Sequence, residues 1–309
     1  MCPHNSIRLL FLSDTHLGYD MPRRMTGSVR PRRGQDFFES FDKALRPALD
    51  GQVDVVVHGG DLFFRSRVRP RLVGMVLDRV RKVVEAGVPF VVVPGNHERS
   101  SMPLPMLWPM EGIEVLSEPR TVLLDRRGLR VALGGFPYFD GDVRGRFPDL
   151  VGRTGLGSAG ADIRLLCMHQ LVEGATVGPS DYVFRGGPDV IPGAALPRNV
   201  AVVLCGHVHR MQVLTRDLRG SRLPSPVIYA GSTERTSLAE RGEQKGYYIL
   251  QLCPAASGAG RVVSRTFNPL DMGHTTLISA STEAGRPRTS TPYPEDGPRQ
   301  PRQISDVSP

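Results

Sequence analysis

Short valine-rich apolar runs alternate with longer amphipathic stretches along this 309-residue chain. Three early runs, IRLLFL, VVVHGG and VPFVVV, are almost wholly apolar, which is typical of strands buried on both faces of a helix-covered sheet. Between the first two runs, Phe38, Phe41 and Leu45 recur at helical spacing, and a second helical pattern covers residues 72–84. This β-α-β-α-β order predicts an α/β fold.

The second half of the chain is richer in predicted strands. Residues 121–135, TVLLDRRGLRVALGG, predict a hairpin that turns at Arg127 and Gly128. Further strands are expected at residues 163–169, 200–207, 226–231, 246–252 and 261–267. Residues 141–160, rich in glycine, arginine and serine, predict a loop. The whole pattern predicts a layered α-β-β-α architecture, in which central β-sheets are flanked by helices.

The amino-acid composition limits the classes of protein to which the chain can belong. Hydrophobic residues make up 40% and charged residues 23%, as in ordinary globular proteins. The net charge of +8 is compatible with an anionic partner, but only three of the 39 basic residues are lysines, so genome base composition explains the arginine bias equally well. The chain shows no membrane-spanning run, no signal peptide and no disulfide pattern, so we expect a cytoplasmic protein.

Five of the predicted strands stop at residues that can bind a metal ion. The motifs are S-D-T-H, G-G-D, P-G-N-H-E, a single histidine and G-H-V-H, and they supply Asp14, His16, Asp61, Asn96, His97, His169, His207 and His209. The carboxyl ends of the strands form the natural crevice of such a sheet. One motif alone is common by chance, whereas the ordered set is not.

This mixture of carboxylates and imidazoles suits manganese, iron or zinc. Two such ions, about 3.5–4 Å apart, can clamp an attack on phosphorus and activate water. They need a shared anionic ligand that offsets their mutual repulsion. The lone Asp61 at its strand tip is the predicted bridge.

The motifs resemble the calcineurin-like metallophosphoesterase superfamily, and most of all its SbcD-type branch of DNA repair exonucleases, the nuclease subunits of double-strand-break repair complexes. The similarity rests on SDTHLG, GDLF, PGNHE, GHVH and YAGSTERTSLAE, and it covers residues 7 to 252. It implies one metal ion on Asp14, His16, Asp61 and His209, and a second ion on Asp61, Asn96, His169 and His207. It also implies manganese as the usual metal and an SbcC-like ATPase as a partner.

The resemblance further implies that His97 is catalytic and not a ligand, since it would approach the substrate phosphate and stabilise or protonate the leaving oxygen. It assigns residues 1–270 to the metallophosphoesterase catalytic domain. Residues 271–309, rich in serine, threonine and proline, predict a disordered tail. The DNA-binding capping domain of the family is therefore expected to be absent, which leaves open how duplex ends and an ATPase are recognised.

Three functions remain open from the sequence: a DNA exonuclease or endonuclease, a phosphoesterase for small nucleotides, and a non-catalytic scaffold that kept the fold. Candidate substrate-binding residues are Arg23, Arg24, Arg32, Arg33, Ser232 and Arg235. The arginines can equally well form a solvated loop, and the Ser232 segment a structural turn. Arg65, Arg67, Arg69 and Arg71 pose the same alternative. The stretch MPLPMLWPM belongs either to the core or to a homodimer contact.

Overall fold

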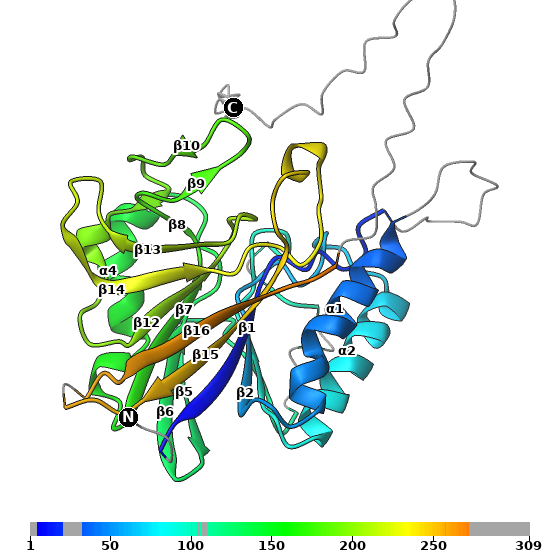
Figure 1. Ribbon diagram of the computed structural model, residues 1–309, viewed down its shortest axis with the longest axis horizontal. Coiled ribbons are helices and arrows are strands. Elements are labelled where there is room, and N and C mark those ends of the chain that lie inside the picture. The colour runs from blue at the N-terminus through cyan, green and yellow to red at the C-terminus, as the bar shows by residue number, and fades with distance from the viewer. Residues whose placement is uncertain are drawn as a thin grey trace, which may run out of the picture. The chain divides into compact units, whose positions relative to one another are not determined.

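Two six-stranded sheets pack face to face at the centre of the fold (Figure 1). The computed structural model describes residues 5–20, 33–99, 101–103, 106, 110–256 and 258–271. In the first sheet the strand order is β16-β15-β1-β2-β3-β4. The strands β1 to β4 are parallel, β15 is antiparallel to β1, and β16 is antiparallel to β15. Their bounds are β1 Ile7–Leu12, β2 Val55–His58, β3 Phe90–Val92, β4 Ile113–Val115, β15 Gly246–Cys253 and β16 Arg261–Pro269.

In the second sheet the strand order is β13-β14-β12-β7-β6-β5. The four inner strands are parallel, and the two edge strands are antiparallel to their neighbours. The bounds are β5 Arg120–Arg126, β6 Leu129–Gly135, β7 Ile163–His169, β12 Val202–Gly206, β13 Gln212–Arg216 and β14 Arg222–Tyr229. The predicted hairpin is confirmed as β5 and β6, with Arg127 and Gly128 at φ 52° and 73° in the turn.

Helices, 3-10 turns and two short strand pairs complete the described part of the chain. The helices are α1 Gly34–Leu49, α2 Pro70–Glu85 and α4 Val143–Arg153, and the 3-10 turns are η1 Leu156–Ser158, η2 Gly193–Ala195 and η3 Leu238–Glu240. Two small strand pairs join β8 Leu171–Val172 to β11 Val190–Ile191, and β9 Thr176–Val177 to β10 Tyr182–Val183.

Alternating strand residues divide the core into three apolar layers. Leu10 and Leu12 of β1 point toward α1 and α2, whereas Leu9 and Phe11 pack against the second sheet. On the far side of the second sheet, Leu166 packs with residues of α4. The predicted α-β-β-α architecture is therefore confirmed.

The prediction of a loop over residues 141–160 is wrong, because α4 occupies Val143–Arg153. Asp142 caps the helix by accepting a hydrogen bond from the backbone N–H of Gly145 at 2.9 Å. Val143, Phe147 and Leu150 form one buried stripe against the second sheet. Packing of that stripe outweighs the poor helix propensity of the glycine and proline around it.

Residues 1–273 form one compact unit. The predicted tail lies almost wholly outside the described residues, and so does most of MPLPMLWPM, so both predictions stay predictions. Among the described residues, no helix is both long and apolar enough to cross a membrane.

Candidate metal centre

The carboxyl ends of parallel strands from both sheets meet at one edge of the fold. Asp14 and His16 follow β1, Asp61 follows β2, Asn96 and His97 follow β3, His169 ends β7, and His207 and His209 follow β12. The two sheets come very close where β2 and β12 end. A Cβ atom on Gly206 would overlap the carbonyl oxygen of Gly59 and crowd the His169 ring, so only glycine fits there.

Asp14, His16 and His209 form the first of two clusters at this edge, called here the first donor group. The Nε2 atoms of His16 and His209 are 2.9 Å apart, and Asp14 Oδ1 is 3.9 Å from the Nε2 atom of His209. One potential ligand atom from each side chain lies within 4.8 Å of the others. His16 and Asp14 are fully buried, so their polar atoms face this cluster and not bulk water.

Asn96, His169 and His207 form the second donor group. The amide oxygen Oδ1 of Asn96 lies 2.9 Å from His169 Nε2 and 2.9 Å from His207 Nδ1. Two imidazole nitrogens and one amide oxygen therefore converge. His207 is also tied to the first donor group, because its backbone N–H donates to the Asp14 carboxylate at 3.1 and 3.2 Å.

The Asp61 side chain lies between the two donor groups. Its Oδ2 atom is 3.9 Å from His16 Nε2 on one side and 3.5 Å from His169 Nε2 on the other. Its Oδ1 atom accepts a hydrogen bond from the backbone N–H of His97 at 2.9 Å, which fixes the carboxylate plane. This is the position that a bridging carboxylate requires.

Hydrogen bonds at Nδ1 orient several of the imidazoles. His169 Nδ1 donates to the carbonyl of Gly59 at 2.8 Å, and His209 Nδ1 lies 3.1 Å from the carboxylate of Glu240. Because these partners only accept, Nδ1 carries the proton and the Nε2 lone pair faces the centre. The donor set of carboxylates, imidazoles and one amide oxygen therefore fits divalent metal ions.

The charge states of Asp61, His16 and His207 suit a cation. Burial would raise the pKa of Asp61, but the neighbouring imidazoles, above all His169, hold that pKa well below its usual range. Burial lowers the pKa of His207 to about 3 and brings the pKa of His16 well below its usual value, so both rings are neutral at pH 7. Neutral imidazole is the form that binds a metal ion. Burial lowers the pKa of His169, but the Asp61 carboxylate outweighs burial and raises that pKa to about 9, so this ring must lose a proton when it binds a metal ion.

Four donors sit on left-handed backbone. Asp14, His16, Asp61 and His207 have φ angles of 51°, 45°, 53° and 87°. Residues other than glycine rarely adopt this region, and such conformations cluster at functional sites. The turn after each strand therefore aims its side chain at the centre at some cost in backbone energy.

His97 lies beside the first donor group. Its Nδ1 atom is 2.7 Å from the carbonyl of Phe64, and its Nε2 atom is 3.8 Å from Asp61 Oδ2. A ligand atom of His97 lies within 4.8 Å of those of His16 and Asp61, so the distances are compatible both with the predicted catalytic role and with a role as ligand. About a third of the side chain is exposed, which leaves a path for substrate.

Two further buried side chains, neither of them a predicted ligand, contact the loops that carry the donors. Glu98 accepts hydrogen bonds from the backbone N–H groups of Asp61, Phe63 and Gly95, at 3.1, 2.6 and 2.7 Å. It thereby joins the loops after β2 and β3, and burial together with the charge of Asp61 raises its pKa to about 8. His58 Nε2 lies 3.0 Å from the hydroxyl of Thr15, between Asp14 and His16.

The predicted substrate-binding residues have different surroundings. Arg33 Nη2 pairs with the buried carboxylate of Glu234 at 2.5 Å, and Nη1 donates to the backbone of Arg235 at 3.0 Å, which favours the structural alternative. Ser232 is fully buried, and its hydroxyl has no hydrogen-bond partner among the described residues. The Arg235 guanidinium donates weakly to the carbonyl of Glu243 at 3.4 Å. Arg23, Arg24 and Arg32 lie outside the described residues.

A second arginine-rich segment, residues 65–71, begins next to the site. Arg65, Arg67, Arg69 and Arg71 are all exposed, and none forms an ion pair with a described residue. Arg65 follows Phe64, whose ring lies 6.0 Å from the ring of His16 and 5.4 Å from that of His97. An unneutralised cationic segment therefore borders the donor groups.

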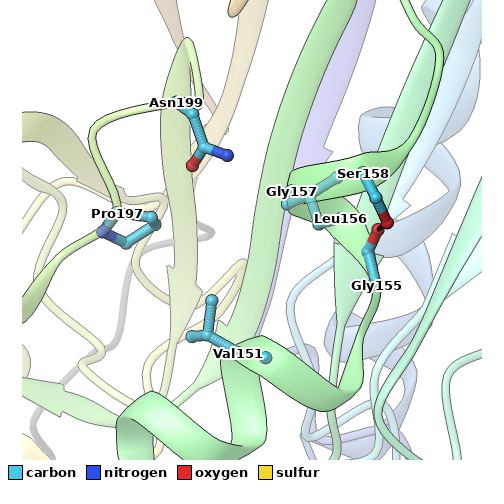
Figure 2. Close-up of a pocket in the computed structure, with 8 residues that line it drawn as sticks. Val151, Gly155, Leu156, Gly157, Ser158, Pro197 and Asn199 are labelled. Atoms are coloured by element: carbon cyan, nitrogen blue, oxygen red, sulfur yellow. Dashed lines mark hydrogen bonds between the residues drawn. The ribbon is translucent and has the colours of Figure 1, made fainter.

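One surface hollow lies away from the donors. Figure 2 shows this hollow of about 190 Å³, lined by Val151, Gly152, Gly155, Leu156, Gly157, Ser158, Pro197 and Asn199. These residues precede the starts of β7 and β12, whereas the donors follow the ends of those strands. The lining carries no ionisable side chain, so it offers no chemistry of its own.

Comparison with known proteins agrees with the geometry. The profile of the calcineurin-like phosphoesterase family matches residues 7–211, which include all the donors. The chain belongs to the calcineurin-like phosphoesterase family. The family resemblance inferred from the motifs is thus confirmed, and a phosphoesterase family explains why potential metal ligands gather at the strand ends.

Within this family, the chain is similar to archaeal proteins named DNA double-strand break repair protein Mre11. It is 31% identical to that of Haloferax volcanii, over 81% of this chain and 50% of the relative. It is 32% identical to that of Methanosarcina mazei, over 85% of this chain and 38% of the relative. For Thermoplasma acidophilum the identity is 29%, over 77% and 58%. The chain thus spans about half the length of these relatives.

Proposed function

We propose that this protein is a two-metal phosphodiesterase that cleaves DNA, as an exonuclease or endonuclease of the SbcD type. The observation that carries the proposal is the position of Asp61, whose carboxylate lies between two separate donor groups. An anionic side chain between two clusters of potential metal ligands is the arrangement that two cations sharing one ligand require.

The first donor group and Asp61 would hold one divalent ion, and the second donor group and Asp61 would hold the other. Manganese is the proposed metal, with iron or zinc as alternatives, because the donors are oxygen atoms and imidazole nitrogens without thiolates. When bound, such ions supply Lewis-acid polarisation of the phosphate and a nucleophilic water at neutral pH.

The side chains of the chain itself orient the reacting groups. The hydrogen bond between His97 Nδ1 and the Phe64 carbonyl directs Nε2 of His97 toward Asp61 and the open side of the site. From there His97 would contact the substrate phosphate and stabilise or protonate the leaving oxygen. Glu98 holds the loops after β2 and β3 together, so that Asp61 and His97 keep their relative position.

DNA is proposed as the substrate for two independent reasons. Several relatives at about 30% identity carry the name of a DNA double-strand break repair protein. In addition, the arginines of the exposed Arg65 to Arg71 segment, which begins beside the centre, have no acidic partner among the described residues, so they can contact a polyanion longer than one phosphate. The proposed partners are an SbcC-like ATPase and a second copy of this chain.

A metal-dependent cleavage assay tests the proposal. The purified chain, stripped of metal and reloaded with Mn²⁺, is compared on single-stranded DNA, duplex DNA and cyclic dinucleotides. Manganese-dependent DNA cleavage is expected. Turnover of cyclic dinucleotides alone would identify a small-nucleotide phosphoesterase, and failure on every substrate despite bound metal would identify a scaffold.

A further inference from the structure

A buried network of charged side chains lies behind His209, on the side away from the metal centre. Its central members are Glu240 in η3 and Lys245 directly before β15, within the segment that joins β14 to β15 (yellow in Figure 1). The Glu240 carboxylate lies 3.1 Å from His209 Nδ1, and Lys245 Nζ lies 2.7 Å from the other Glu240 oxygen.

The ammonium group of Lys245 is completely enclosed. It is 1% exposed, in a chain that has only three lysines. Besides Glu240, its Nζ atom contacts the carboxylate of Glu243 at 3.1 Å and donates to the backbone carbonyl of His209 at 2.9 Å. Lysine has three N–H donors, and all three are used here. Lys245 therefore fixes both the carboxylate behind the ring and the backbone that carries the ring.

Glu240 is held equally firmly. Its Oε1 atom accepts hydrogen bonds from the hydroxyls of Thr236 and Ser237 at 2.6 and 3.3 Å, and its Oε2 atom faces Lys245. A carboxylate fixed in this way can only accept from the imidazole, so His209 keeps its proton on Nδ1. The Nε2 lone pair then points toward His16 and Asp14.

Stability alone is a weak reason for such a network. Burying an ammonium ion and carboxylates carries a desolvation penalty that the ion pair does not clearly outweigh, and apolar residues often serve equally well. Within the donor groups, the network contacts a single proposed ligand, His209, at its Nδ1 atom and at its backbone carbonyl.

We propose that Glu240, anchored by Lys245, is a positioning residue that fixes the tautomer and ring orientation of His209 and thereby sets the metal affinity of the first donor group. This inference rests on the proposed two-metal function. Loss of such a partner typically weakens metal binding about 10–100-fold. The effect should fall on the first donor group, since the second has no contact with Glu240.

The test is Mn²⁺ titration by calorimetry of the full chain, compared with Glu240→Ala and Glu240→Gln. We expect two sites in the unsubstituted protein. Glu240→Ala should weaken one of them about 10–100-fold and leave the other unchanged. Glu240→Gln should retain part of the affinity, because its amide oxygen can still accept from Nδ1.

Glu234→Gln is the matched control. Glu234 is as buried as Glu240 and also ion-paired, but its partner is Arg33 and it touches no proposed ligand. Its Mn²⁺ affinities should be unchanged. Melting temperatures of the metal-free proteins separate a stabilising role of Glu240 from a positioning role. If Glu240→Ala and Glu234→Gln lose equal stability and Glu240→Ala keeps its Mn²⁺ affinity, the positioning role is overturned.

The unsubstituted protein distinguishes this inference from the proposed function. If it binds two Mn²⁺ ions and cleaves DNA while Glu240→Ala binds both with full affinity, only the positioning role fails. If the unsubstituted protein binds no Mn²⁺, the proposed function fails first, and the positioning role fails with it.

Discussion

The histidines of the two donor groups are oriented by different kinds of hydrogen-bond acceptor. In the first, His209 is oriented by a side-chain carboxylate, Glu240, from a segment that follows β14. In the second, His169 is oriented by the backbone carbonyl of Gly59, at the point where the two sheets touch. A side-chain support can be exchanged by one substitution, whereas a backbone support can be disturbed only by moving the sheets. The first donor group is therefore the tunable half of the centre, and the second is fixed by the fold.

The largest expected effect comes from the residue that both halves share. Asp61→Asn removes the negative charge between the two donor groups, so both ions should be lost together, and turnover should fall at least ~10³-fold. Metal stoichiometry by mass spectrometry checks this, with circular dichroism to confirm the fold. A variant that keeps two ions and full turnover would rule out the bridging role.

Substitution of His97 tests whether the first donor group contains an additional metal ligand. His97→Ala should retain both ions and lose about 10²–10⁴-fold in turnover, since a general acid or electrostatic contributor has that effect on rate. The measurement pairs Mn²⁺ titration with hydrolysis of a chromogenic phosphodiester. Loss of one ion would instead place His97 in the first donor group.

Gly206 tests the backbone support of the second half. In Gly206→Ala the new methyl group collides with the Gly59 carbonyl and the His169 ring. We expect overpacking to lower stability by about 1–3 kcal/mol and to weaken Mn²⁺ binding at the second donor group more than at the first.

Gly74→Ala in α2 is the control for this substitution, because a methyl group there meets no atom within 4 Å. It should leave both Mn²⁺ sites unchanged and stabilise α2 by up to ~1 kcal/mol. Equal weakening of the two sites in Gly206→Ala would show that backbone support is not specific to the second half.

The smallest effect is expected outside the centre. Changing the four exposed arginines of residues 65–71 to glutamine should flatten the salt dependence of DNA binding, by up to about 0.9 per phosphate contact on duplex DNA. Mn²⁺ binding at both halves and hydrolysis of a small phosphodiester should stay nearly constant.

A control set carries the same charge change on arginines that already have acidic partners: Arg46, Arg120, Arg130 and Arg146. An equal loss of salt dependence in both sets would mean that overall charge, and not the segment beside the centre, attracts DNA.

The two halves also differ in how far the sequence alone could predict them. All the donors can be predicted from the sequence, because each lies at or shortly after the end of an apolar run. The carboxyl ends of parallel strands meet at one edge of a sheet. Glu240 cannot be predicted in this way, since its contact with His209 joins residues 31 positions apart. The one available signal was Lys245, a rare lysine in an arginine-rich chain. The family resemblance included Glu240 within its last motif but gave it no role.

Other features that the sequence does not predict also depend on contacts between residues far apart in the chain. Arg33 looked like a phosphate contact from its local sequence, yet it pairs with Glu234, which is 201 positions away. The sequence predicts a loop over residues 141–160 because glycine and proline disfavour a helix locally, whereas the apolar stripe of α4 is stabilised only when it packs on the second sheet. Local patterns therefore predict most strands of the two sheets and the residues at their ends, but not β4 and β13, and long-range pairing determines the rest.

The left-handed backbone at Asp14, His16, Asp61 and His207 sets a limit on engineering this fold. Each such residue costs of order 1–3 kcal/mol relative to relaxed backbone, and glycine would relieve most of that cost. Selection for thermal stability alone would therefore favour glycine at these four turns. The resulting chain would be more stable but would lack four of the proposed metal-binding side chains. Screens for stabilising substitutions in this protein should therefore keep the four positions fixed.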